Sequence, residues 1–400
     1  MKSFQLRNTK QYTFFTLIGI FTIAGMNQGL TLPLLTILLD KMGVSSVANG
    51  FNAASLYIGM FLLSPCMDWV VRRIGYKRTL MLGLVIVTAS TLLLPMFRMY
   101  SIWFVLRMLI GIGDSALGYA SQMWITVISS PERRGRDLSI YYLTYGVGFS
   151  IGPFGILLLP YGTWAPFLAI VVCYLAAFVM LSMLKNEFPP AETESHNQRS
   201  RYLLVIRMGW VALLPSFIFG YMEAMLNSSF PLYALHMGLQ AKWVSFILAA
   251  FVVGSLILQL PLGRLSDAWG RPQVMRICAV VGAISFLLFP STHSSFIAMI
   301  VTLGVAGACV GSFYSLGFAY ATDILPVSMI PTAGAIASMN YSVACILSPN
   351  INGWIIQHVN ANAIFWGMGG LLLVFIVSSL FSTPSSSSNA SNSNASTTYF

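Results

Sequence analysis

Three ionisable side chains of this sequence lie inside long apolar blocks: Arg107, Asp114 and Glu223. An ionised side chain at mid-bilayer costs about 2.5 to 3.5 kcal/mol, so such groups normally face a partner or a wet cavity. Low dielectric also disfavours the charged form of an acid, which makes a buried carboxyl group able to carry a proton. The three residues therefore predict a proton-coupling site inside a membrane. The structural alternative is that the arginine bonds helix carbonyls and each acid stays neutral beside a neighbour.

The elements that must position these residues are about a dozen apolar blocks. Only 8% of the residues are charged and 57% are hydrophobic, whereas a soluble globular protein carries about a quarter charged residues. A hydrocarbon core of about 30 Å needs roughly 20 apolar residues per helix, and the blocks lack the alternation of barrel strands. We predict an all-α polytopic membrane protein whose twelve transmembrane helices cover residues 12–39, 47–67, 79–97, 101–129, 138–159, 164–184, 208–235, 243–265, 274–290, 295–321, 332–356 and 363–381.

The net charge of +10 follows the predicted topology and does not indicate a nucleic-acid partner. If the N-terminus is cytoplasmic, 17 of the 21 Lys and Arg fall in cytoplasmic segments. Lys41, Arg98 and Lys242 fall outside, and Arg107 lies within a span. We therefore predict a multi-pass protein of the cytoplasmic (inner) membrane with both termini in the cytoplasm.

The chain divides into two similar halves around a polar stretch after the sixth span. A shift of 195 residues places Met42 and Gly43 on Met237 and Gly238, and it also aligns the pairs Phe51 and Phe246, Ala54 and Ala249, Gly59 and Gly254, Gly75 and Gly270, and Pro131 and Pro326. A parallel repeat of six spans is the internal symmetry of one large transporter class. We predict an N-terminal six-helix bundle over 1–184, a cytoplasmic linker over 185–206, a C-terminal six-helix bundle over 207–382 and a disordered Ser/Asn-rich tail over 383–400.

A loop motif identifies a family that the chain resembles. Gly263, Asp267, Gly270 and Arg271 have the spacing of the cytoplasmic-loop signature of the major facilitator superfamily. The resemblance implies a two-bundle transporter in which this loop latches the cytoplasmic helix ends, with Asp267 and Arg271 as the gating charges. The residues also suit a tight turn whose charges stay in water. The first-half counterpart is degraded, with Asp68 in place of the first glycine.

The fourth span carries the proposed coupling arginine. Arg107, Gly111, Asp114 and Gly118 recur at helical spacing and share one face. The run from Arg107 to Gly111 is similar to the family's fourth-helix motif, in which related proton-coupled members assign the arginine to coupling. Arg107 and Asp114 lie roughly 10 Å apart along the axis, so we expect them to share a cavity without pairing.

The fifth span supplies a glycine-proline motif. Gly148, Gly152, Pro153 and Gly155 resemble the motif of the antiporter branch, although the two residues usual between the proline and the next glycine are missing. The small residues also allow close helix packing, and the proline bends the span. Together with the carboxylates, this motif points to the 12-span drug:proton antiporter branch of bacteria.

The resemblance also assigns a central cavity to spans one, four, seven and ten. That cavity would collect Asn27, Gln28, Asp114, Glu223 and Tyr314. We predict a secondary active transporter working by alternating access, with proton-coupled efflux of a small amphipathic or cationic compound. Proton-coupled uptake of a sugar or organic acid is the alternative, and Arg107 facing an anionic substrate would favour it.

Other function classes find little support in the sequence. Four scattered histidines and five scattered cysteines have no metal-ligand spacing, and no phosphate loop or nucleophile elbow occurs. We expect no cofactor, no metal and no catalytic residues, which disfavours a membrane enzyme or sensor. The expected partners are protons, a small-molecule substrate and the lipid bilayer, and a monomer is expected.

Overall fold

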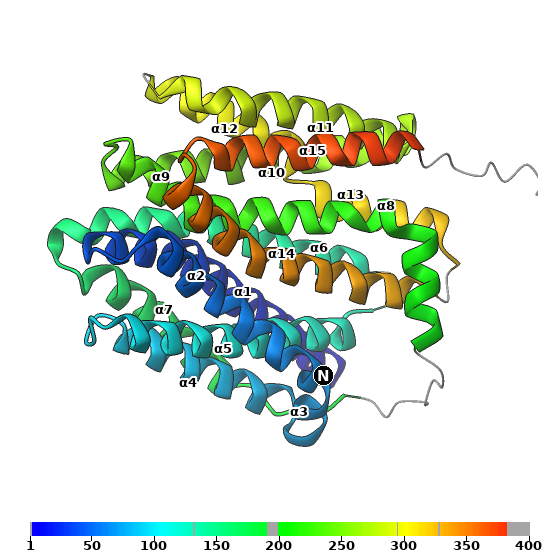
Figure 1. The fold of residues 1–400 in the computed structure, drawn as a ribbon. Coiled ribbons are helices and arrows are strands. Elements are labelled where there is room, and N and C mark those ends of the chain that lie inside the picture. Colours follow the sequence, from blue (N-terminus) through cyan, green and yellow to red (C-terminus); the bar gives the residue numbers. More distant parts are fainter. Residues whose placement is uncertain (1, 131–132, 190–198, 294, 327–328, 382–400) are drawn as a thin grey trace, which may run out of the picture.

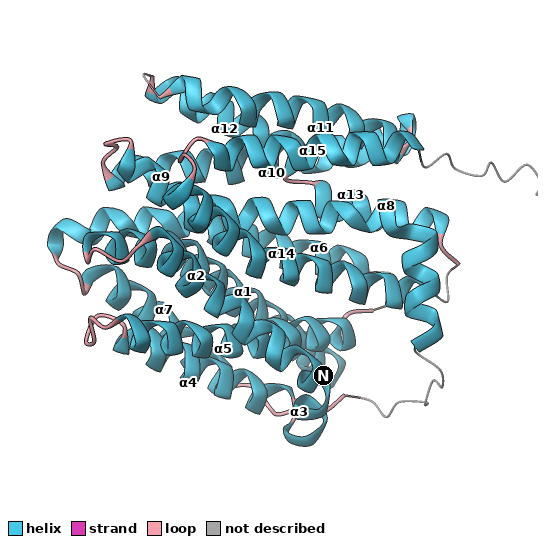
Figure 2. Ribbon diagram, in the orientation of Figure 1, coloured by secondary structure: helices cyan, strands magenta, loops and turns pink. Residues whose placement is uncertain are grey.

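The structure is a computed structural model that describes residues 2–130, 133–189, 199–293, 295–326 and 329–381. Within these ranges every regular element is helical (Figure 2). The first half contains α1 (Lys2–Lys41), α2 (Ser46–Leu63), η1 (Ser64–Cys66), α3 (Met67–Ile74), α4 (Tyr76–Leu93), α5 (Tyr100–Ile128), α6 (Arg134–Ile151), η2 (Gly152–Tyr161) and α7 (Ala165–Ser182). The second half contains α8 (Arg199–Ala224), η3 (Met225–Ser229), α9 (Phe230–His236), α10 (Ala241–Trp269), α11 (Arg271–Leu288), η4 (Phe289–Thr292), α12 (Phe296–Val310), α13 (Phe313–Ile324), α14 (Ile330–His358) and α15 (Ala363–Phe381).

The helices form two bundles that lie side by side, the N half in blue to green and the C half in green to red (Figure 1). Eleven helical stretches among the described residues are long and apolar enough to cross a membrane. Helix α14 has the same length, 29 residues, as α5 and α10 but is less apolar. It packs on α8 of its own half and on α2 of the other, so much of its polar surface meets protein. The predicted fold of twelve helices in two bundles is confirmed.

The internal repeat is visible in the turns. Gly43 and Gly238 adopt φ angles of 76° and 78°, and Gly75 and Gly270 adopt 85° and 89°. These angles lie in the region that residues with a Cβ rarely adopt. The backbone bond from Val44 to Leu39 is matched 195 residues later by the bond from Leu239 to Ala234. The aligned glycines therefore end equivalent helices in equivalent turns.

Glycines also set the closest helix crossings. A Cβ at Gly111 of α5 would overlap the Leu56 carbonyl of α2, and one at Gly59 of α2 would overlap the Met108 carbonyl. The C half repeats this crossing between α10 and α12 at Gly254 and Gly307. Small residues at such points let helix backbones touch, which is the main source of packing energy between helices in lipid.

The antiporter-type motif lies at the crossing of α1 and α6. A Cβ at Gly148 or Gly152 would overlap the Thr22 or Met26 carbonyl of α1, and one at Gly155 would crowd the Leu30 side chain. At Gly152 the α-helix gives way to the 3-10 helix η2. The close-packing interpretation of these glycines is confirmed. Pro153 adds a contact between halves, because its carbonyl accepts a hydrogen bond from Ser245 of α10, at 2.7 Å.

Contacts that join the two halves gather at one end of the bundles. We name this the distal end; it carries the turns at residues 42–45, 94–99 and 237–240, while the linker end carries Gly75, Gly270 and residues 183–189. At the distal end Val47 N donates to Gln357 Oε1 at 3.2 Å, and His236 Nε2 lies 3.4 Å from Asp40 Oδ1. Helices α2 and α14 also touch there through Gly50 and Gly353.

The predicted domain boundaries stay a prediction. Residues 190–198 of the linker, the tail from 382 onward and Pro131 lie outside the described residues. Helix α8 already begins at Arg199, inside the predicted linker, and is bent at Gly209, where φ is −125°. The start of the linker is bound to the N half, because Asn186 Oδ1 accepts from Lys77 N at 3.0 Å at the start of α4.

Candidate functional site

Asp114 lies at the centre of the N half in contact with α1 and α6. The side chain is only 6% exposed on α5, and its Oδ2 accepts a hydrogen bond from Gln28 Nε2 at 3.2 Å. Gln28 Oε1 in turn accepts from the Tyr145 hydroxyl at 2.5 Å. The chain from Tyr145 through Gln28 to Asp114 joins three helices. The Gln28 amide and the Tyr145 hydroxyl are both neutral, so neither offers the Asp114 carboxyl group a positive charge.

Glu223 is the intramembrane acid of the C half, and the 195-residue repeat pairs it with Gln28 of α1. It is partly exposed near the end of α8, and its Oε2 accepts from the Tyr341 hydroxyl of α14 at 3.1 Å. The π-helix η3 begins two residues later, and Asn227 within it donates to the Glu223 carbonyl at 2.7 Å. Such π segments interrupt a helix and often occur at functional sites. The partial exposure leaves this carboxyl group open to a ligand.

Tyrosines link the two carboxyl groups across the halves. The Tyr145 hydroxyl lies within electrostatic range of both Asp114 and Glu223. The Tyr57 hydroxyl of α2, which is itself buried without a hydrogen-bond partner, lies within range of Glu223 and Arg107. Asp114 and Glu223, together with Gln28, Tyr145 and Tyr341, form the group of residues that we call the central cluster.

Arg107 lies at the α2–α5 contact, apart from Asp114. It is 1% exposed, and its Nη1 donates to Asn52 Oδ1 at 3.0 Å. Its Nε and Nη2 atoms are buried without a hydrogen-bond partner. Arg107 and Asp114 thus have different partners, in line with the expected 10 Å separation. A buried guanidinium with free donors is costly, so Arg107 has capacity to bind an acceptor.

Of the polar residues predicted to line the central cavity, Gln28 belongs to the central cluster and Tyr314 lies next to it, but Asn27 does neither. Gln28 touches Asp114 directly, and the Tyr314 ring packs edge-on against Tyr341, with centroids 6.0 Å apart. Asn27 is fully buried and lies near Tyr174 of α7. Asn27 therefore faces another neighbour than Gln28 does, as expected for adjacent residues of a helix, which point about 100° apart.

Four uncharged residues around the ionisable side chains were not among the predicted site residues. Tyr145 and Tyr341 were among several tyrosines at depth, and Asn52 and Tyr57 carried no signal at all. All four are polar residues within apolar blocks, which is the only sequence feature they share. Their roles depend on contacts between helices far apart in the chain, such as the 118 residues between Glu223 and Tyr341.

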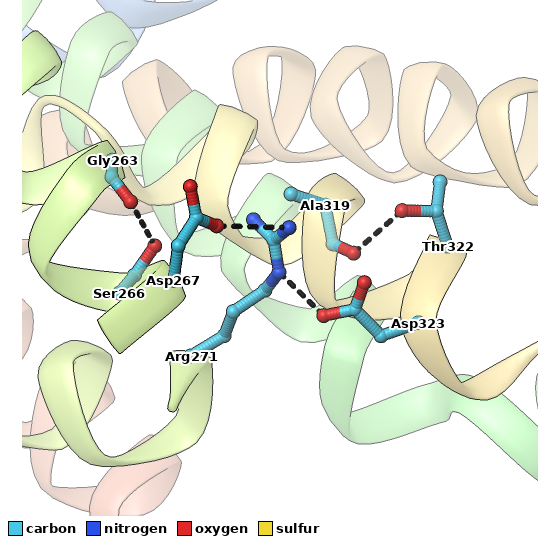
Figure 3. Close-up of polar contacts among 7 residues, drawn as sticks. All are labelled: Gly263, Ser266, Asp267, Arg271, Ala319, Thr322 and Asp323. Atoms are coloured by element: carbon cyan, nitrogen blue, oxygen red, sulfur yellow. Dashed lines mark hydrogen bonds and ion pairs between the residues drawn. The ribbon is translucent and has the colours of Figure 1, made fainter. Parts of the chain in front are cut away.

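The loop motif of the C half contributes Asp267 and Arg271 to a three-residue ion cluster at the linker end (Figure 3). Arg271 Nη2 lies 3.2 Å from Asp267 Oδ1, and its Nε donates to Asp323 Oδ2 at 2.5 Å. Gly270 makes the turn and has room around its Cα, as has Gly263. Asp323 belongs to α13 and was not predicted. The cluster ties the α10–α11 turn to α13.

In the N half, a different set of side chains connects the turn before α4 to helix α5. Asp68 Oδ2 accepts from Arg72 Nε at 2.7 Å, and Asp68 Oδ1 accepts from the Tyr119 hydroxyl of α5 at 3.0 Å. The degraded motif therefore still ties the turn before α4 to α5. In the C half an arginine bridges to an acid, whereas in the N half an acid bridges to a hydroxyl.

We expect Arg271→Gln and Asp323→Asn to slow transport more than Asp267→Asn. Arg271 is 22% exposed and makes both contacts, while Asp267 is 65% exposed and makes only the longer one. Each exposed pair contributes about 0 to 1 kcal/mol, so insertion and stability should stay close to wild type. The measurement is the exchange rate of purified variants in liposomes. If Arg271→Gln exchanges substrate at the wild-type rate, the ion cluster has no part in gating and serves only to form the turn.

Comparison with known proteins now places the chain. The model of the Major Facilitator Superfamily matches residues 17–245 and 212–398. The chain belongs to the major facilitator superfamily.

Relatives within the superfamily cover most of the chain. The MFS-type transporter YfkF of Bacillus subtilis strain 168, named as uncharacterized, is 37% identical over 366 residues, covering 89% of this chain and 92% of that protein. The MFS-type transporter YcaD of Shigella flexneri, also named as uncharacterized, is 23% identical over 343 residues, covering 85% and 87%. This protein is therefore a membrane transporter of the MFS type. The drug:proton antiporter branch stays a prediction.

Solved structures of the superfamily share the fold. The nucleoside transporter NupG superposes with a TM-score of 0.71 at 14% identity, covering 93% of this chain and 98% of that one. A bacterial homologue of the human lysosomal transporter Spinster, solved in an inward-facing and unoccupied conformation, superposes with a TM-score of 0.70 at 13% identity, covering 93% and 95%. At these identities the likeness concerns the fold alone.

Metal binding finds no support among the residues with described positions, since no three His, Cys, Asp or Glu side chains come together there to hold an ion. The five cysteines are free. The central cluster contains two carboxyl groups, each bonded by a neutral donor.

Proposed function

We propose that this transporter couples protons to the efflux of a small amphipathic or cationic compound. The observation that carries the proposal is that Asp114 and Glu223, one from each half, accept hydrogen bonds from neutral donors, Gln28 and the Tyr341 hydroxyl. A carboxyl group in such surroundings binds either a proton or an organic cation, since either removes the cost of a buried negative charge. Tyrosine rings add favourable faces for a cation.

Competition for the two carboxyl groups provides the coupling. Protons entering from the side of higher proton concentration displace the cation, and rocking of the two halves exposes the cluster to the opposite side. The distal contacts through Val47, Asp40 and Ser245 support a state closed at that end. Under the predicted topology the distal end faces outward, so this state would receive substrate from the cytoplasm.

The predicted topology is part of the proposal. With both termini in the cytoplasm of a bacterial cell and the protein in its inner membrane, Lys242 of the distal end faces outward. A cysteine at position 242 should react with a membrane-impermeant maleimide added to whole cells, and one at position 195 should react only after lysis. Labelling of position 195 from outside would reverse the orientation. We also propose a monomer as the functional unit.

Proton-coupled uptake of an anionic or sugar-like substrate is the second candidate. The unused Nε and Nη2 donors of buried Arg107 favour it, because they suit a carboxylate or hydroxyl acceptor. A nucleoside transporter is among the solved structures with a similar fold.

Transport by purified protein in liposomes under an imposed pH gradient separates the two candidates. The panel contains lipophilic cations, sugars and organic acids, with liposomes lacking protein as the control. Efflux predicts that a cation moves against its gradient in the direction opposite to protons. Movement of a sugar or organic acid together with protons would instead establish the uptake candidate.

A further inference from the structure

A cavity of about 260 Å³ lies at the distal end of the N half, separate from the central cluster. Its walls come from the end of α1, the α4–α5 turn, α5, the end of η2 and the start of α7. The volume is below the roughly 300 to 1,000 Å³ of sites for drug-sized ligands. The cavity therefore suits a small group and not the whole of a transported compound.

One wall of the cavity is basic. Lys41 and Arg98 both line it, and Arg98 Nη2 donates to Thr163 Oγ1 at 3.2 Å. These are two of the three basic residues that the sequence places at this end, and the lining contains no acid. Asp40, next to Lys41, is paired with His236. Two cations facing one space without an acid between them favour an anionic ligand.

Most of the remaining lining is apolar. Trp103 and Phe167, which are 2% and 1% exposed, line the cavity together with Leu38 and Leu159. The Trp103 indole N–H is already donated to the Leu94 carbonyl at 2.9 Å, so the ring can offer only its apolar surface to a ligand. A ligand that fits both kinds of lining carries an anionic group next to an apolar part.

We propose that this cavity binds the phosphate of an anionic phospholipid headgroup, with the glycerol region against Trp103. The cavity lies among the turns at one end of the membrane-spanning helices, which is where headgroups are found. Phosphate is the chemistry that Lys and Arg recognise together. The inference is independent of the transported substrate, because it concerns neither Asp114 nor Glu223.

Lipid binding there would act on the closed distal end. Lys41 adjoins Asp40, which pairs with His236 of the C half, and η2 carries the Pro153 carbonyl that binds Ser245. A headgroup that orders the end of α1 and the end of η2 therefore stabilises two contacts between the halves. A ligand that binds only the folded protein raises its melting temperature, and the rise grows with the logarithm of ligand concentration once the site is filled.

The test is thermal unfolding of the full chain, purified in uncharged detergent, with added dihexanoylphosphatidylglycerol. Inorganic phosphate and dihexanoylglycerol, which supply the anion and the apolar part separately, form the other two arms. We expect a rise in melting temperature that grows with phospholipid concentration, and little change with either separate part. An equal rise with inorganic phosphate would overturn the lipid assignment in favour of a free anion.

The variants are Lys41→Gln with Arg98→Gln, and Lys242→Gln as the matched control. Lys242 is the third basic residue at this end, but it lies over the Trp243 ring, 4.9 Å from its centroid, and does not line the cavity. The phospholipid effect should disappear in the double variant and persist in the control. Persistence in the double variant, or equal loss in the control, would overturn the proposal.

A direct readout covers the case in which the double variant does not fold. A short-chain phosphatidylglycerol with bromine on its acyl chains should quench the fluorescence of Trp103 in the wild-type protein. The saturable part of the quenching should fall in Trp103→Phe, since Trp103 is the tryptophan in the cavity wall, while exposed tryptophans elsewhere give a non-saturable background. Unchanged quenching in Trp103→Phe would show that the lipid binds elsewhere.

Discussion

Liposomes carrying Asp114→Asn or Glu223→Gln are expected to lose substrate accumulation driven by a pH gradient. Each change keeps the shape and hydrogen-bonding capacity of the side chain but removes the group that gains and loses a proton. The amide can still meet Gln28 or Tyr341, so folding should survive. Accumulation should fall to the level without a gradient for at least one variant, while substrate binding persists more strongly than transport.

The matched control for this loss is Asp137→Asn. Asp137 is another half-buried carboxylate, bound by the Ser129 hydroxyl at 2.7 Å at the linker end, outside the central cluster. Its variant should accumulate substrate at the wild-type level. If both central variants also do so, Asp114 and Glu223 are structural and the coupling mechanism is wrong.

The second large effect is expected from Gly111→Ala, measured as the melting temperature of the purified protein. The added methyl would overlap the Leu56 carbonyl and crowd the Met60 backbone nitrogen, which no side-chain rotation relieves. Helices α2 and α5 must move apart, and the buried bond between Asn52 and Arg107 lies one turn away. Overpacking of this kind costs typically about 1 to 3 kcal/mol. Expression of folded protein should fall with it.

Gly367→Ala is the matched control for this steric argument. Gly367 also lies within a long apolar helix, α15, but has no atom within 4 Å of the position that a Cβ would take. Alanine is the better helix former, so this variant should be neutral or slightly stabilised. Equal stability of Gly111→Ala and Gly367→Ala would show that the α2–α5 crossing adjusts without cost.

Local chemistry made much of the fold predictable. The spans followed from the length of the apolar blocks, and the turn at Gly270 followed from the positive φ angles that glycine allows. Gly43, Gly75 and Gly238 were marked only as matched positions of the repeat, and they adopt positive φ angles too. The repeat was readable because both halves need the same turns and crossings at the same places. The glycine-proline run could also be interpreted as a packing surface before its partner helix, α1, was known, because small residues allow helices to approach closely.

Contacts between distant helices were not predictable. Asp323 lies 52 residues beyond Arg271, and nothing in its surroundings marks it as the partner of that loop. The repeat relates Gln28 to Glu223 and Tyr145 to Tyr341, at shifts of 195 and 196 residues. It does not say that each tyrosine bonds to its partner, which depends on how α6 and α14 are rotated. A span pattern gives the position of a residue along a helix but leaves open which neighbour it faces.

The modest apolarity of α14 has a consequence for how the protein is inserted into the membrane during synthesis. Each segment leaving the ribosome is tested against lipid, and a segment with many polar residues partitions poorly on its own. The partners α2 and α8 are synthesised earlier than α14, so we infer that they receive it during insertion. Damage to the α2–α14 contact, as by substitution at Gly50 or Gly353, should then appear as misinserted and degraded chains before any defect of turnover is measured.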